Sequence, residues 1–181
     1  MAFPRWKVHT AVAGISSGAM NFIPTEQYAT IISVLPILCV DVLIINQFGE
    51  YLLVKRANEP KKDVWWPVGG RVHKGETLEQ AVIRKVREET GLSVKTMKPV
   101  GYFEAVADVN PFDSRLPYHS VSVIFATVVN NQSHVKLDNQ SVEWKYSKEL
   151  PSSFCMRSFE SKESDRSGCN DPKFLEQGKY K

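Results

Sequence analysis

Residues 70–92 read GRVHKGETLEQAVIRKVREETGL, and this stretch decides the fold. From Thr77 to Thr90 the apolar residues recur with the spacing of an amphipathic helix, and Gly91 follows where a helix C-terminus favours glycine. At about 100° per residue, the apolar residues gather on one side of this helix. We expect that side to face the core, and its members are Leu78, Val82, Ile83 and Val86.

The same helix carries charged residues that flank its apolar side together, namely Lys85, Glu88 and Glu89. Two neighbouring carboxylates that point one way offer the hard oxygen ligands that Mg²⁺ and Mn²⁺ prefer. The glycine pair Gly69 and Gly70, just before the helix, permits a close approach of the backbone and supplies a carbonyl. The segment therefore predicts a site for a divalent cation.

The sequence around this helix predicts strands on both sides of it. Asn46 and Gly49 fall between two apolar, β-branched runs, which indicates a hairpin. Hairpins together with a helical crossover imply an α/β fold with a mixed sheet. The expected strands cover residues 34–45, 51–55, 94–109, 118–129 and 141–146, and short helices are expected to start near residues 25 and 148.

The composition suits one globular domain with a tail, since the chain has 181 residues, 43% of them hydrophobic and 24% charged. We divide it into an N-terminal arm (1–23), a domain (24–151) and a polar C-terminal tail (152–181). A net charge of +3 is too small to indicate a nucleic-acid partner. No apolar run reaches the roughly 18 residues of a membrane span, so no membrane partner is expected.

The three cysteines, Cys39, Cys155 and Cys169, show neither the spacing of a zinc site nor the pattern of a disulfide framework. Glycine, serine and threonine interrupt the apolar run between Ala11 and Ala19, so we expect no signal peptide. Both observations favour a reduced protein of the cytoplasm.

Residues 70–92 resemble the Nudix box, GX5EX7REUXEEXGU, in which U is an aliphatic residue. Every fixed position matches except Lys85, where the family has glutamate. The chain from 22 to 151 further resembles the GDP-mannose mannosyl hydrolases, a Nudix branch that also lacks this glutamate. The resemblance implies a Nudix α/β/α sandwich around a mixed central sheet, a homodimer, and cleavage at the sugar carbon with a single Mg²⁺. The similar stretches are 25–30, 51–58 and 69–74.

The resemblance also assigns metal ligands. The Gly69 carbonyl and Glu89 would hold Mg²⁺, or alternatively Mn²⁺, and Gln140 falls at a third ligand position. Glu88 is a further candidate ligand beside Glu89. An ammonium at Lys85 would repel additional metal ions, so we expect one metal. The alternative is that Lys85 only forms a salt bridge with Glu88.

On the substrate side, the resemblance places Arg56 and Arg71 against the diphosphate, with Asp41 and His119 near the substrate. Ser141 falls where the branch has its catalytic histidine. A serine does not accept a proton near pH 7. We therefore treat Ser141 as the position of a lost base, with His119 as its replacement and Arg71 as a further catalytic candidate.

Three hypotheses of function follow. The leading one is a metal-dependent Nudix hydrolase of a nucleoside diphosphate sugar, which turns GDP-mannose and water into GDP and mannose. The first alternative is a Nudix pyrophosphohydrolase that cuts at phosphorus, favoured by the retained pair Glu88 and Glu89. The second is a non-enzymatic module that binds nucleotide sugars, suggested by Lys85 and Ser141.

Overall fold

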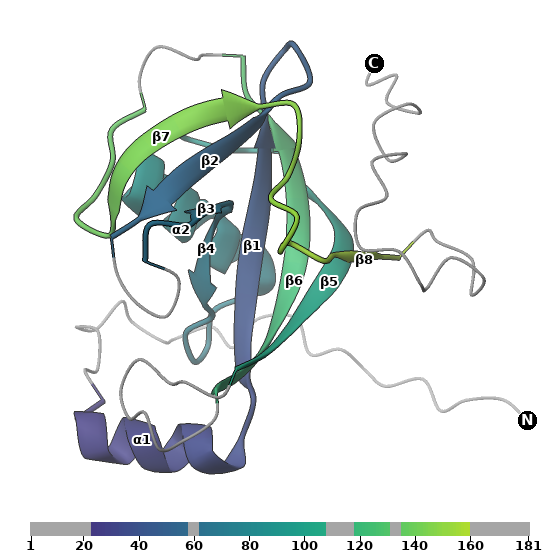
Figure 1. Cartoon of the computed structure of the whole chain (residues 1–181). Helices are drawn as coiled ribbons and strands as arrows, with labels where there is room; N and C mark the ends of the chain where they lie inside the picture. The colour runs from purple at the N-terminus through teal and green to yellow at the C-terminus, as the bar shows by residue number, and fades with distance from the viewer. Residues whose placement is uncertain (1–22, 58–61, 108–117, 131–134, 160–181) are drawn as a thin grey trace, which may run out of the picture.

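The fold is built on one mixed sheet (Figure 1). The computed structural model describes residues 23–57, 62–107, 118–130 and 135–159. The strand order is β3-β2-β1-β6-β5-β8, while β4 pairs with β1 and β7 pairs with β2. The elements are α1 (Thr25–Val34), β1 (Ile37–Ile45), β2 (Tyr51–Arg56), β3 (Trp65–Trp66), β4 (Val68–Arg71), α2 (Leu78–Thr90), β5 (Lys98–Ala107), β6 (Tyr118–Val128), β7 (Ser141–Ser147) and β8 (Arg157–Ser158).

The centre of the sheet is the parallel pair of β1 and β6, with Ile37 opposite Ser120 and Ile45 opposite Val128. The other pairings among the described strands are antiparallel. Parallel strands need a long connection, and here that connection includes α2. The predicted α/β fold with a mixed central sheet is therefore confirmed.

The turn between β1 and β2 is organised by one side chain. The Asn46 Oδ1 accepts hydrogen bonds from the N–H groups of Phe48 and Glu50, each at 2.9 Å. Its Nδ2 donates to the Glu50 carboxylate at 2.8 Å. Gly49 takes a positive φ of 75°, which glycine adopts without strain. These contacts confirm the predicted hairpin.

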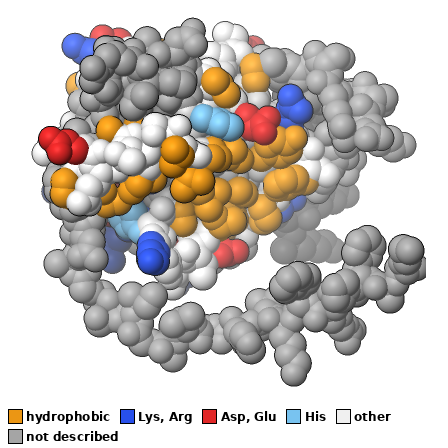
Figure 2. Space-filling view, turned by 90° about the horizontal axis from the view of Figure 1, so that it is seen from below, with side chains coloured by type: hydrophobic (Ala, Val, Ile, Leu, Met, Phe, Trp, Pro, Cys, Tyr) orange, Lys and Arg blue, Asp and Glu red, His pale blue; other side chains and the backbone are white. Residues whose placement is uncertain are grey.

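At one end of the sheet lies α1, which confirms the short helix expected near residue 25. Tyr28 and Ile32 are its buried side chains. Figure 2 looks at this end of the molecule and shows hydrophobic side chains gathered on the surface. The homodimer implied by the resemblance stays a prediction. Exposed apolar residues of α1 and of the chain entering β1 are Ile31, Val34, Leu35 and Leu38.

Hydrogen bonds fix both ends of α2, at the positions where the sequence predicted that the helix begins and ends. The Thr77 hydroxyl accepts a hydrogen bond from the Gln80 N–H, while the Gln80 side chain accepts from the Thr77 N–H, which forms a capping box. Gly91 adopts the left-handed conformation, with φ 69°, and donates to the Arg87 carbonyl. The predicted helix is confirmed to within one residue.

The buried side of α2 differs in part from the predicted one. Val82 and Val86 are buried as expected, but Ile83 is 43% exposed. Lys85 and Glu89 are buried in its place. Hydrophobicity alone assigned Ile83 to the core, whereas the helix is rotated so that a charged pair turns toward the sheet.

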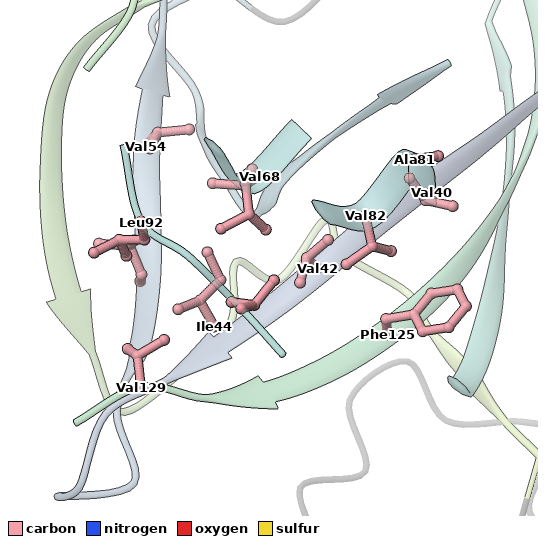
Figure 3. Close-up of a cluster of buried hydrophobic side chains, with 13 residues drawn as sticks. Val40, Val42, Ile44, Val54, Val68, Ala81, Val82, Leu92, Phe125 and Val129 are labelled. Atoms are coloured by element: carbon pink, nitrogen blue, oxygen red, sulfur yellow. The ribbon is translucent and has the colours of Figure 1, made fainter. Parts of the chain in front are cut away.

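Apolar cores occupy both faces of the sheet, and β1 supplies both because consecutive side chains of a strand point to opposite faces. Val40, Val42 and Ile44 point to the face that α2 covers, as Figure 3 shows. Leu43 and Ile45 belong to the core on the opposite face. We call the side with Val40, Val42 and Ile44 the helix face, and the side with Leu43 and Ile45 the open face.

The segment that follows β7 departs from the prediction. A helix expected near residue 148 is absent from the described residues 148–159, so that prediction is wrong. The Ser147 hydroxyl donates to the Glu149 carbonyl and accepts from its N–H, which favours a turn. Pro151 also disfavours the helical conformation at Leu150.

Residues 152–159, which the sequence assigned to the tail, pack on the open face. Phe154 is fully buried, and its ring stacks on Phe103 with centroids 5.6 Å apart. Trp66 packs edge-on against the same two rings. The rest of the predicted tail, 160–181, and nearly all of the arm lie outside the described residues.

The cysteines differ from one another. Cys39 is a buried cysteine outside any disulfide bond, whereas Cys155 is disulfide-bonded, so the expected reduced state is wrong for Cys155. Spacing along the chain did not reveal this bond, because disulfides depend on proximity in the fold. In the part of the chain that the structure describes, no helix has the length and apolar character needed to cross a membrane.

Candidate active site

A pocket of about 130 Å³ is lined by residues from both faces of the sheet, with Val54 from the helix-face core and Trp66 and Phe103 from the open-face core. Small-molecule sites commonly measure about 300–1,000 Å³, so a nucleotide-sized ligand would extend beyond this pocket. Its wall combines β-strand residues, the end of α2 and the loop before β7. The lining residues are Cys39, Asp41, Val54, Arg56, Trp66, Pro67, Gly69, Gly70, Glu89, Phe103, Ala105, Ser120, Ser122, Gln140 and Ser141.

The floor of the pocket is polar because β1 and β6 both change from apolar to polar side chains at the same end. On the open face, β1 passes from Leu43 in the core to Asp41 in the pocket. Likewise, β6 passes from Ile124 in the core to Ser122 and Ser120 in the pocket. Since β1 and β6 are parallel and in register, both changes fall at one end of the face. The apolar core therefore gives way to a polar floor.

Gly69 brings the backbone of β4 against the acidic groups of the pocket. It pairs with Asp41 across the sheet. A Cβ at position 69 would overlap the Asp41 carboxylate and lie 2.5 Å from the Val40 carbonyl oxygen. The Gly69 N–H also donates to the Glu89 carboxylate. This approach explains why glycine stands here, as the sequence predicted.

Glu89 extends from the last turn of α2 to the pocket and is 6% exposed. Lys85, one turn earlier, places its Nζ 2.5 Å from Glu89 Oε1. Burial raises the pKa of the Glu89 carboxyl above its usual range, although the Lys85 ammonium and the Gly69 N–H both lower it. Glu89 is therefore a carboxylate that the protein stabilises incompletely.

A second ion pair lies where the box loop meets α2. Arg84 donates from Nε and Nη2 to the two oxygens of Glu76, at 2.7 and 2.9 Å. Arg84 Nη2 also donates to the Arg71 carbonyl, and Glu76 accepts from the His73 N–H. The Arg84 guanidinium holds the pKa of Glu76 below its usual range, against an opposing effect of burial. These contacts tie the loop to the helix.

Arg56 is the cationic residue of the pocket wall. Its backbone N–H donates to the Val64 carbonyl at the end of β2. Its side-chain Nε is buried, and within the described ranges it donates no hydrogen bond. A buried donor without an acceptor is rare in native structures, so this atom indicates where an anion would bind.

The structure brings most of the predicted site residues together. The pocket contains Gly69 and Glu89 of the predicted metal set, with Gln140 beside them. The Gln140 N–H donates to Asp138, and its carbonyl accepts from the Ala57 N–H. The predicted substrate residues that also line the pocket are Asp41, Arg56 and Ser141.

Three predicted site residues lie outside the pocket wall. The Arg71 guanidinium stacks 4.6 Å from the centroid of the Tyr28 ring, on α1. His119 is exposed and precedes Ser120, so it points to the opposite face of β6. Glu88 is 44% exposed and pairs with Arg84 at 3.1 Å.

Sequence analysis missed Cys39, Ser120 and Ser122, which line the floor of the pocket. Their signal was present as small residues at alternate positions of otherwise apolar strands. Such positions share one face of a strand, so they mark where a core opens into a pocket.

The donor set of the pocket suits a hard cation. The described residues contain no group of three or more histidine, cysteine, aspartate or glutamate side chains arranged to hold a metal ion. The candidate ligands instead combine one carboxylate, Glu89, with the amide of Gln140 and the backbone at Gly69. Oxygen ligands of these kinds fit Mg²⁺ or Mn²⁺. The residues therefore fit one divalent cation, provided that Lys85 yields its place on Glu89.

Comparison with known sequences gives a consistent family. A model described as the NUDIX domain matches residues 35–154. The low-salt glycan biosynthesis protein Agl8 of Haloferax volcanii is 31% identical over 123 residues, which cover 68% of this chain and 78% of that protein. An ADP-ribose pyrophosphatase of Methanocaldococcus jannaschii is 38% identical over 82 residues, or 45% of each chain.

Solved structures share the fold. A MutT NUDIX hydrolase from Burkholderia pseudomallei gives a TM-score of 0.56 at 21% identity, covering 65% of this chain and 88% of that one. The NUDIX domain of Shewanella oneidensis NrtR, complexed with ADP ribose, gives 0.51 at 23% identity, covering 70% and 77%. With the family model spanning most of its length and the box in place on α2, this chain belongs to the Nudix hydrolase family.

Proposed function

We propose that this Nudix hydrolase cleaves a nucleoside diphosphate sugar at the sugar carbon, with GDP-mannose as the leading substrate. The observation that carries the proposal is the buried Arg56 Nε, which lacks an acceptor among the described residues. An unpaired buried donor costs free energy, and a diphosphate oxygen would satisfy it. The planar guanidinium also matches the geometry of a phosphate group.

The sugar part of the substrate is supported by two likenesses. A relative is named as a glycan biosynthesis protein, and glycans are assembled from activated sugars. The resemblance of residues 51–58 and 69–74 to the GDP-mannose branch favours the same class. Both likenesses favour a nucleotide sugar over a plain nucleoside triphosphate.

In this proposal Glu89, Gln140 and the Gly69 carbonyl hold one divalent cation, Mg²⁺ first and Mn²⁺ second. Such a cation, when bound, neutralises the diphosphate and stabilises it as a leaving group. Arg56, which also lines the pocket, binds the same anion. A leaving group stabilised in this way departs without a general acid.

The proposed proton acceptor is Asp41, because it lines the pocket and is buried there. Ser141 lines the pocket but accepts no proton near pH 7. His119 points away from the pocket floor. Asp41 is a buried carboxylate of that floor, and an ionised carboxylate accepts a proton from an attacking water.

A second candidate function is hydrolysis at phosphorus. The relative named as an ADP-ribose pyrophosphatase favours it, as does the presence of both Glu88 and Glu89. The same Arg56 and the same pocket would bind the diphosphate in either reaction. The two functions therefore differ in the atom that water attacks.

Hydrolysis in ¹⁸O-labelled water with Mg²⁺ tests the proposal. The panel is GDP-mannose, GDP-glucose, UDP-glucose and ADP-ribose, with the products identified by mass spectrometry. Attack at carbon gives a nucleoside diphosphate and puts the label in the sugar. Attack at phosphorus gives a nucleoside monophosphate and puts the label in a phosphate, which would replace the proposal by the second candidate.

The control is Glu89→Gln prepared in the same way, because it reveals contaminating hydrolases. If the wild type binds a nucleotide sugar but releases no more product than this variant, the protein is a binding module and the proposed hydrolysis is wrong.

A further inference from the structure

Lys85 lies where the Nudix box has a glutamate, and its ammonium is enclosed rather than solvated. Its side chain is 8% exposed. The Nζ lies 2.5 Å from Glu89 Oε1 and 3.6 Å from Glu88 Oε2. A Cβ at Gly70 would lie 2.9 Å from its Cε, so the glycine makes room for the chain. Lys85 therefore places a positive charge of the protein itself near the carboxylates of Glu88 and Glu89. The backbone of β4 at Gly70 lies against its side chain.

The Lys85 ammonium is paired with Glu89, the carboxylate that a divalent cation would bind. Glu89 is the carboxylate among the pocket ligands assigned above to the metal. A divalent cation on Glu89 would repel an ammonium at this distance strongly in a buried setting. The Lys85 ammonium and a divalent metal ion therefore cannot contact Glu89 at the same time. One must leave when the other binds.

Glu88 offers the departing ammonium a second acceptor. It is one residue further from the pocket, it is 44% exposed, and its Oε2 already lies within ion-pair distance of Lys85. Movement to Glu88 requires rotation about the flexible side-chain bonds of lysine and no change in the backbone. Glu88 is not part of the described pocket wall, which separates it from the metal ligands.

We propose that Lys85 is an exchangeable internal cation: it neutralises Glu89 until a divalent metal ion displaces it, and the displaced ammonium then pairs with Glu88. The proposal rests on the proposed function in one respect, that the metal binds at Glu89. It assigns Glu88 to holding Lys85 rather than to holding metal. It also implies that the metal binds more weakly than the ligands alone would allow.

The test is Mn²⁺ binding to the full chain, measured by electron paramagnetic resonance of free Mn²⁺ and by calorimetry, without substrate. Lys85→Met removes the ammonium and keeps a long apolar chain. We expect it to bind Mn²⁺ about tenfold or more tightly than the wild type. Arg87→Met is the matched control, since it removes the same charge from an exposed position of α2 and should stay within about twofold.

Unchanged Mn²⁺ affinity in Lys85→Met would overturn the proposal, as would an equal gain in Arg87→Met, which would show a general charge effect. Lys85→Gln, a neutral polar variant, guards against an effect of methionine on local packing. It should also bind Mn²⁺ more tightly than the wild type, and a loss of affinity would contradict the exchange.

A double-mutant cycle tests the role of Glu88. In the wild type, Glu88→Gln should weaken Mn²⁺ binding severalfold, because displaced Lys85 loses its second acceptor. In the Lys85→Met background the same change should alter the affinity by less than about twofold. An equal loss in both backgrounds would show that Glu88 acts on the metal directly, and the exchange would be wrong.

Glu89→Gln in the Lys85→Met background separates this proposal from the proposed function. Loss of Mn²⁺ binding there supports the metal site, whatever Lys85 does. Retention of tight binding would show that the metal lies elsewhere, and both proposals would fail. Loss of binding in this double variant, together with unchanged affinity in Lys85→Met, would leave the metal site standing and remove the exchange alone.

Discussion

Two ion pairs within the Nudix box each join a carboxylate to a cationic side chain, but the pKa values of the two carboxylates shift in opposite directions. Arg84 contacts both oxygens of Glu76, at 2.7 and 2.9 Å, and the pKa of Glu76 is lowered. Lys85 contacts one oxygen of Glu89 at 2.5 Å, and burial nevertheless raises the pKa of Glu89. The protein satisfies the first carboxylate more completely than the second.

The difference lies in the donors around each carboxylate. Glu76 receives a forked guanidinium and the His73 N–H, which together tie the box loop to α2. Glu89 is deeper and receives a single ammonium and the Gly69 N–H, with Asp138 opposing its ionisation. A carboxylate that its own protein stabilises incompletely is available to a ligand. We therefore infer that the pair of Glu76 and Arg84 stabilises the fold, and we propose that the pair of Glu89 and Lys85 belongs to the reactive site.

The largest expected effect is the loss of turnover in Glu89→Gln. The amide keeps the shape of the side chain and removes the charge that binds a hard cation, so hydrolysis should fall about 100-fold or more. A product assay with Mg²⁺ measures it. Glu79→Gln is the matched control, because Glu79 is an exposed carboxylate in the first turn of α2. Wild-type turnover in Glu89→Gln would remove Glu89 from the site.

Next in size is the loss of stability in Arg84→Met. The guanidinium makes charge-assisted hydrogen bonds to Glu76 and one to the Arg71 carbonyl. Removing it should lower the free energy of unfolding by about 2–3 kcal/mol. Urea denaturation measures this, with Arg87→Met expected to change stability by less than about 0.5 kcal/mol. Equal stability of the two variants would contradict a structural role for the first pair.

A smaller effect is expected at Arg56, which takes part in neither ion pair. Its buried Nε donates no hydrogen bond within the described residues. Arg56→Lys keeps the charge and removes the fork, so kcat/KM should fall about tenfold while stability is retained. Lys55→Gln is the control, because Lys55 forms a surface ion pair with Glu143. If both variants keep the wild-type kcat/KM, the diphosphate binds elsewhere.

The smallest effect is the pH dependence of the first pair. Because the pKa of Glu76 is lower in the folded protein, its stabilising effect is full above the unfolded value of about 4.3 and is lost as pH falls through the folded pKa. The stability difference between the wild type and Glu76→Gln should therefore vanish in acid. Urea denaturation from pH 7 downward measures it, and a constant difference would contradict the assignment.

The pH dependence of stability expected from Glu89 is opposite to that expected from Glu76. Its raised pKa favours folding when the carboxyl is protonated, and this contribution is lost as pH rises through the folded pKa. The stability of Glu89→Gln relative to the wild type should therefore improve as pH increases across that range. The two variants, compared over one pH series, should diverge in opposite directions.

The sequence predicted those parts of the fold that depend on local signals. Thr77 and Gly91 mark the ends of α2, and Asn46 marks the hairpin, because caps and turns are decided by a few neighbouring residues. The prediction was wrong where tertiary contacts decide, as at Ile83, which is exposed, and near residue 148, where Ser147 supports a turn.

For the candidate site, the charged side of the helix and the glycine pair before it pointed to Glu89 and Gly69 as part of a cation site. The resemblance assigned both to the metal and added Asp41, Arg56 and Gln140. Neither source revealed that Lys85 turns inward onto Glu89, because that depends on how α2 is rotated against β4. The stacking of Arg71 on Tyr28 was also beyond prediction, since it joins residues of distant segments.

The division between the two ion pairs is tested most directly by the Mn²⁺ affinity of two isosteric variants, Glu76→Gln and Glu89→Gln, titrated side by side on folded protein. We predict that Glu76→Gln binds Mn²⁺ within about twofold of the wild type, because Glu76 serves the fold. Glu89→Gln should show no saturable binding, because it removes the carboxylate that the proposal assigns to the metal. Equal losses in the two variants, or full affinity in Glu89→Gln, would contradict the division.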